Sequence, residues 1–154
     1  MSGAQIETLK RRLVEAIALQ LEAQLAQLTA KIDSAREAAK GEVKSSAGDK
    51  YETGRAMMHL EEEMFTRQRA SIFEQRSALT EIPLVAQEEV TLGALVESSR
   101  GPLFFSVGVG LVKIDGVGYL CLSAEAPLAE ALWGAEAGDE VDFRGAQIQV
   151  EAIS

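Results

Sequence analysis

The chain has 154 residues, with 15 lysines and arginines against 24 aspartates and glutamates, and its formal net charge is −9. This acidic balance argues against free DNA or RNA binding, which depends on neutralising phosphates. The longest uncharged stretch, 101–112, is too short for a membrane-spanning helix of about 20 residues, and the first residues lack the features of a signal peptide. We therefore expect a cytoplasmic protein that does not enter a membrane.

The charge is distributed unevenly along the chain. Residues 1–79 hold 12 basic and 12 acidic residues, whereas the remainder holds 3 basic and 12 acidic ones. All three prolines and nine of the 13 glycines also follow residue 79. A change of this kind in composition and charge indicates two structural units.

Residues 4–43 predict one long helix. No proline interrupts 4–43, and apolar residues recur with a mean step of about 3.7, which is close to the helical period. A single apolar stripe therefore runs along the predicted helix. Its members are Ile6, Leu9, Leu13, Ile17, Leu21, Leu25, Leu28, Ile32, Ala35 and Ala39.

A second helix is predicted over 51–79, after a small polar run at 44–50. Met58, Phe65, Ile72 and Leu79 follow one another at seven-residue spacing. Two long apolar stripes joined by a short turn can bury each other only by folding back antiparallel. We therefore predict an antiparallel coiled-coil prong over 1–79 with its tip at about 44–54. Three further residues are expected to broaden the second stripe: Met57, Leu60 and Met64.

The C-terminal part predicts a small β-rich domain. Residues 80–89 form a linker in which Pro83 stops the helix, and the domain covers 90–154. Its β-branched and aromatic runs are separated by glycine-containing turns, which predicts an antiparallel β-sheet with one short helix. The fold class is thus α+β. The expected strands lie at 90–97, 103–109, 112–114, 119–123, 140–143 and 147–153, and the helix lies at 126–132.

Two residues that often carry chemistry do not indicate it here. Cys121 alternates with leucines in a predicted strand, a pattern typical of a buried structural thiol, and a lone cysteine excludes an internal disulfide. His59 lies on the second helix without a Cys, His or Ser partner at a catalytic spacing. Neither is predicted to be catalytic.

Two carboxylates at the tip form the candidate site. Asp49 and Glu52 are three residues apart at the start of the second helix, so their side chains can lie on one face. Such carboxylates can share a Mg²⁺ ion, which prefers oxygen ligands. The same spacing also fits a capping box, with Asp49 as the N-cap and Glu52 reaching back to it. The two interpretations are compatible, because a cap also fixes side-chain orientation.

The order of these features resembles the Gre-type bacterial transcript-cleavage factors, which combine a coiled-coil prong with an FKBP-like domain. Gly48-Asp49-Lys50-Tyr51-Glu52 resembles the tip motif Gly-Asp-x-x-Glu of that family. A second likeness lies in Ser123-Ala-Glu-Ala-Pro127-Leu128-Ala-Glu-Ala-Leu132-Trp-Gly134, which resembles the C-terminal Ser-Pro-[Ile/Leu]…Leu-[Ile/Leu]-Gly segment of the same factors, with Ala126 in place of the serine. The resemblance spans almost the whole chain.

The resemblance implies a partner and a mode of action. Gre-type factors insert their coiled coil into the secondary channel of RNA polymerase, where the 3′ end of backtracked RNA is extruded. By similarity, Asp49 and Glu52 would help hold a Mg²⁺ ion shared with the polymerase and stimulate RNA cleavage. The chain would donate metal ligands and would not be an enzyme by itself or bind a cofactor alone. The C-terminal domain would dock on the polymerase through Pro127, Leu128 and Trp133.

Two other functions remain open on the sequence. Thr53-Gly54 follows Glu52 where the family carries asparagines, which favours a secondary-channel regulator or inhibitor that does not cleave. A coiled-coil adaptor or dimerisation protein unrelated to transcription is the second alternative.

Overall fold

The computed structural model describes the backbone of residues 1–45 and 49–154, and the side chains of all of these except 39, 41–45 and 49–51. Contacts divide the chain into two compact units. One comprises 1–20 and 75–154, and the other comprises 21–74. Within the described part of the chain, no helix is long and apolar enough to cross a membrane.

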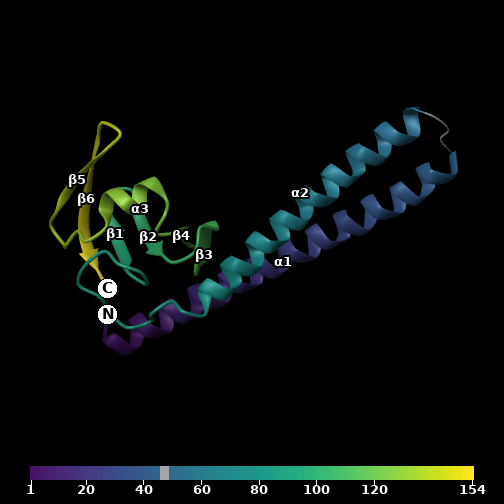
Figure 1. Ribbon diagram of the computed structural model, residues 1–154. Coiled ribbons are helices and arrows are strands. Elements are labelled where there is room, and N and C mark those ends of the chain that lie inside the picture. Colours follow the sequence, from purple (N-terminus) through teal and green to yellow (C-terminus); the bar gives the residue numbers. More distant parts are fainter. Residues whose placement is uncertain (46–48) are drawn as a thin grey trace. The chain divides into compact units, whose positions relative to one another are not determined.

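Two long helices confirm the predicted hairpin (Figure 1). Helix α1 spans Gly3–Ser45 and α2 spans Asp49–Leu79. Within residues 21–74 they run side by side, and an ion pair joins them where Arg36 Nε lies 3.0 Å from Glu62 Oε1. Leu28 and Ile32 of α1 and Phe65 and Ile72 of α2 are buried, as the helical spacing predicts.

The expected broadening of the α2 stripe is wrong. Met57, Leu60 and Met64 are 66, 63 and 45% exposed. At 100° per residue, Met57 and Met64 lie about a quarter turn away from the line of Phe65 and Ile72 on α2, and Leu60 lies more than a third of a turn away. Phe65 and Ile72 of the seven-residue row are buried, whereas the three additional side chains remain in solvent.

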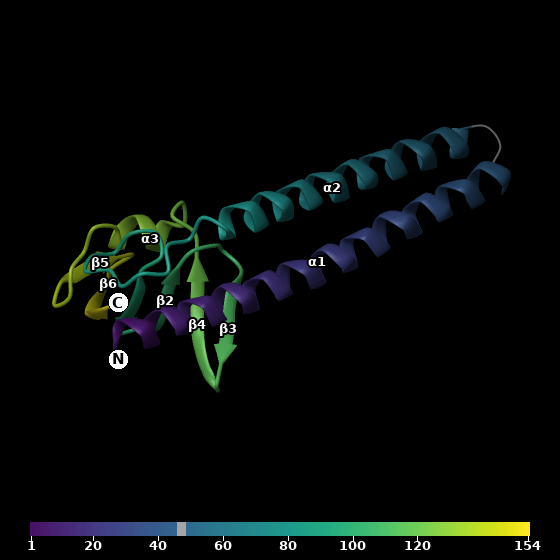
Figure 2. The same ribbon diagram turned by 90° about the horizontal axis from the view of Figure 1, so that it is seen from below.

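The C-terminal residues form a six-stranded sheet and one short helix, as expected, but the sheet is mixed. The strand order is β3-β4-β2-β1-β6-β5. Figure 2 shows β4 between β2 and β3. The elements are β1 Leu95–Ser98, β2 Gly101–Phe105, β3 Gly110–Ile114, β4 Val117–Leu122, α3 Pro127–Leu132, β5 Glu140–Phe143 and β6 Ala146–Ile153.

One ladder departs from the expected antiparallel pattern, because β2 and β4 pair in parallel while the other pairs are antiparallel. Either β3 or β4 could lie next to β2, and the difference in their burial explains why β4 does. Strand β3 has exposed Leu111 and Lys113, whereas Cys121 and Leu122 of β4 are buried. A strand with a lysine suits a sheet edge, so β3 takes the outer position and leaves the inner one to β4.

The expected first strand at 90–97 begins later, at Leu95. Residues 91–94 turn instead, and Gly93 has a φ of +88°. A Cβ at this position would lie 2.5 Å from the Pro83 carbonyl oxygen, so the linker packs against a site that only glycine can occupy. Val90 and Ala94 are nevertheless buried in the core, together with Val96, Leu103, Phe105, Leu122, Ala129, Leu132, Ala135, Ile148 and Val150.

Lys10 takes a core position that the apolar pattern of α1 does not include. Its side chain is fully buried, while its neighbour Leu9 is only half-buried. The ammonium group donates a hydrogen bond of 2.8 Å from Nζ to the carbonyl oxygen of Val85 in the linker. Burial lowers the pKa of Lys10 from its usual 10.5 to about 8, because desolvation disfavours the charged form.

This pKa predicts a pH dependence of stability. Below pH 8 the amine is protonated in both the folded and the unfolded chain. Between about 8 and 10.5 only the unfolded chain holds the proton, so the free energy of unfolding rises with pH. Relative to Lys10→Met, the wild type is expected to gain no more than about 3.5 kcal/mol over this range. Urea unfolding of both proteins near the two ends of the range measures the gain.

Lys113→Met is the matched control, because Lys113 is an exposed lysine on β3. Its difference from the wild type is expected to stay constant with pH. An equally constant difference for Lys10→Met would contradict the assignment of this titration to Lys10.

Candidate functional site

The tip carboxylates lie at the start of α2. Asp49 is the first helical residue, and its side chain is outside the described residues. Glu52 follows in the first turn and is exposed. The capping box and the shared Mg²⁺ site therefore stay predictions. Among the described residues, no group of three His, Cys, Asp or Glu side chains could hold a metal ion.

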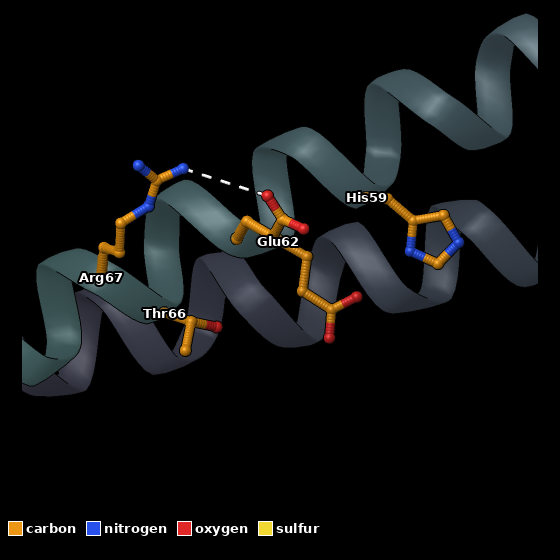
Figure 3. Close-up of a pocket in the computed structure, with 5 residues that line it drawn as sticks. His59, Glu62, Thr66 and Arg67 are labelled. Atoms are coloured by element: carbon orange, nitrogen blue, oxygen red, sulfur yellow. Dashed lines mark ion pairs between the residues drawn. The ribbon is translucent and has the colours of Figure 1, made fainter.

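A shallow groove on α2 contains His59 (Figure 3). Its charged residues already have partners, since Arg67 Nη2 lies 3.9 Å from Glu63 Oε2 and Glu62 pairs with Arg36. Thr66 completes the lining. In this groove His59 has carboxylates and a guanidinium as neighbours and no nucleophilic side chain apart from that threonine. This surface has the character of a solvated, charge-balanced helix face.

The predicted docking residues lie at the two ends of α3. Pro127 is the first residue of the helix and is exposed. Trp133 follows the last helical residue and is 42% exposed, with its ring 6.3 Å from that of Phe105 at an interplanar angle of 70°. Leu128 is half-buried and packs against the core, while Leu132 is fully buried. Pro127 and Trp133 thus offer more free surface than Leu128.

Comparisons with known proteins find distant structural likenesses. No protein-family model matches the chain, and no curated protein matches it either. Among solved structures, the chain resembles Gfh1. The GreA factor homolog 1 (Gfh1) of Thermus thermophilus is 18% identical, with a TM-score of 0.32 over 89% of this chain and 94% of that one.

Two further structures give similar values. One, described as the transcription factor Gfh1, is 20% identical, with a TM-score of 0.30 over 90% of this chain and 93% of that one. The Thermus aquaticus Gfh1 is also 20% identical, with a TM-score of 0.30 over 90% of this chain and 94% of that one. Likenesses at this level assign neither a family nor a function to the chain.

A bidentate ion pair that the sequence does not reveal joins α1 to the β3–β4 turn. Arg12 Nη1 lies 2.7 Å from Asp115 Oδ2, and Arg12 Nη2 lies 3.0 Å from Asp115 Oδ1. The hydrogen bonds and opposite charges raise the pKa of Arg12 and lower that of Asp115. Nearby, Gln20 Nε2 donates to the Val109 carbonyl oxygen at 3.0 Å. Together these contacts hold the first half of α1 beside β3.

The lone thiol is structural, in agreement with the prediction from the sequence. Cys121 is buried in β4, and burial raises the pKa of its thiol to about 12. Because only the thiolate is strongly nucleophilic, this side chain is inert at neutral pH. Its Sγ donates a weak hydrogen bond to the carbonyl oxygen of Tyr119 at 3.8 Å.

Proposed function

We propose that this chain is a factor that binds RNA polymerase, inserts its helical hairpin into the secondary channel and stimulates cleavage of backtracked RNA. The observation that carries the proposal is the position of the Gly-Asp-x-x-Glu motif. Asp49 begins α2, and the exposed Glu52 lies within its first turn, in the helical hairpin unit 21–74. A two-helix hairpin of this length can carry carboxylates far into a narrow channel.

The carboxylate chemistry supports a shared metal site. The exposed Glu52 carboxylate offers the oxygen ligands that Mg²⁺ prefers. Two side chains are too few for octahedral coordination, so the remaining ligands would come from the polymerase. When bound, Mg²⁺ supplies charge stabilisation at the attacking and leaving oxygens of the phosphodiester. In this arrangement Asp49 and Glu52 bind and orient, and the chain alone does not hydrolyse RNA.

The direct test uses a stalled, backtracked elongation complex that contains RNA labelled at its 5′ end. Purified protein is expected to accelerate the appearance of shortened RNA, and it should leave the same RNA intact in the absence of polymerase. Binding to polymerase without any acceleration would refute the proposal and leave the regulator described next.

A non-cleaving channel regulator is the second candidate. Thr53 and Gly54 follow Glu52, and neither residue carries a side-chain amide with which an asparagine could position a water or the RNA. Such a regulator would slow nucleotide addition by occupying the channel. Slower RNA extension with unchanged cleavage favours this function over the first.

The exposed aromatic ring at the end of α3 predicts a measurable contribution to docking. Trp133→Ala is expected to weaken polymerase binding by at least about tenfold, since partly exposed tryptophans are frequent centres of interface energy. Titration of labelled protein with polymerase measures the change. Val117→Ala removes a side chain of similar exposure, 44%, and should bind normally. Equal affinities for the two variants would place the docking surface elsewhere.

A further inference from the structure

One side of the hairpin unit 21–74 carries few charges. On α2, residues 57, 61, 64, 68 and 71 follow one another at steps of four and three, so they lie along one side of the helix. Met57, Met64, Gln68 and Ser71 on this line are uncharged, and Leu60 lies beside them. We call the surface made by this line and the facing part of α1 the neutral face.

Two shallow grooves run along the neutral face between the helices. In one, Gln24 and Gln27 of α1 lie opposite Gln68 and Ser71 of α2. In the other, Ser34 and Ala38 of α1 accompany Phe65 of α2. Lys31 lines both grooves, which places them next to each other on the same side of the hairpin.

The neutral face also exposes large apolar side chains. Met57, Leu60 and Met64 form a row along nearly two turns of α2. Burying such residues against a partner is favourable at about 25 cal/mol per Å² of apolar surface. The groove around His59, by contrast, is lined by paired charges, so the hairpin has one solvated side and one side suited to a protein contact.

The charges on the neutral face indicate which partner fits. Of the residues that line its two grooves, only Lys31 and Glu61 are charged, and they have opposite signs. Neither has an ion-pair partner among the described residues. A surface with one cation, one anion and an apolar row is complementary to itself. A two-fold axis between the charges places Lys31 of each copy opposite Glu61 of the other.

The levels of these residues agree with such an axis. The Arg36–Glu62 ion pair marks one level across the hairpin. Lys31 lies five residues before Arg36, and Glu61 lies one residue before Glu62. Because the helices are antiparallel, these offsets point in opposite directions along the hairpin, and at 1.5 Å per residue they separate Lys31 from Glu61 by about 9 Å. The midpoint falls at the level of Met64. An axis there would pack the two Met64 side chains together and leave a Lys31–Glu61 pair on either side.

We propose that the neutral face is a self-association surface, on which two copies of the chain pack their hairpins antiparallel with reciprocal Lys31–Glu61 ion pairs. The contact is independent of RNA polymerase. While it is formed, it covers part of the hairpin that the proposed insertion into the channel requires, so the two states exclude each other.

Sedimentation of the full-length chain over a range of concentrations tests the proposal. The wild type is expected to show a monomer–dimer equilibrium. Lys31→Glu and Glu61→Lys are each expected to weaken the dimer at least about tenfold, because each places like charges opposite one another. An equimolar mixture of the two variants restores both ion pairs and should dimerise at least as well as the wild type, as should the double variant Lys31→Glu/Glu61→Lys.

Asp33→Lys is the control matched to Glu61→Lys, because it makes the same change from a negative to a positive charge at an exposed residue of α1 that lies more than half a turn from Lys31. It should dimerise like the wild type, and circular dichroism should show equal helix content in all variants. A wild type that stays monomeric at every concentration would overturn the proposal. So would single variants that dimerise normally, or a mixture that fails to recover the dimer.

Discussion

Replacing Asp49 by Asn and Glu52 by Gln is expected to abolish stimulation of RNA cleavage while leaving polymerase binding intact. The amides keep the size of the side chains and remove both negative charges at the start of α2. Loss of a group that only orients a metal ligand typically lowers metal affinity or activity about 10–100-fold. Loss of the ligands themselves should therefore lower the cleavage rate at least about 100-fold. The measurement is the rate of RNA shortening in the backtracked complex at saturating protein.

The matched control is Asp33→Asn/Glu74→Gln. It makes the same two chemical changes at exposed residues of α1 and α2 that lie away from the tip. This variant should stimulate cleavage like the wild type. Full activity in Asp49→Asn/Glu52→Gln would show that the tip charges have no part in the reaction, whatever the protein does at the polymerase.

The second large effect is expected in the C-terminal core. Phe105 of β2 is fully buried in the core cluster and makes an edge contact with Trp133. Phe105→Ala is expected to lower the free energy of unfolding by about 3–5 kcal/mol, through lost burial and the cavity that remains. Urea unfolding followed by far-UV circular dichroism measures the loss. The fluorescence of Trp133, which is the only tryptophan, follows the unfolding of the unit that contains Phe105.

Phe73→Ala provides the comparison. Phe73 lies on α2 and is 48% exposed, so its removal should change stability by less than about 0.5 kcal/mol. If both variants lost equal stability, burial of the ring would not be the source of the effect at Phe105.

The helices and most strands follow from local pattern. The spacing of Leu28, Ile32, Phe65 and Ile72 predicts both helices and their buried rows, and all four residues are buried. Pro127 correctly places the start of α3. These features depend on the backbone period and on local chain restrictions, and both are encoded within a few residues.

The tip and docking residues are predicted from motif order and resemblance. The structure places Asp49 at the start of α2, an exposed Glu52 in its first turn and an exposed Trp133 at the end of α3. Their roles await the cleavage and binding measurements, since position alone does not define what a side chain contacts on another molecule.

Other features depend on residues that are remote in the chain. Lys10 is buried where the Val85 carbonyl oxygen, 75 positions away, accepts a hydrogen bond from its Nζ. Met57 and Met64 are exposed because α1 covers only one narrow row of α2. The parallel pairing of β2 with β4 likewise depends on which strand occupies the edge. The hydrophobic period and the turn residues determine where helices and strands form. Which side chains are buried and which strands pair depends on the surface that each element packs against, and the local sequence does not specify that surface.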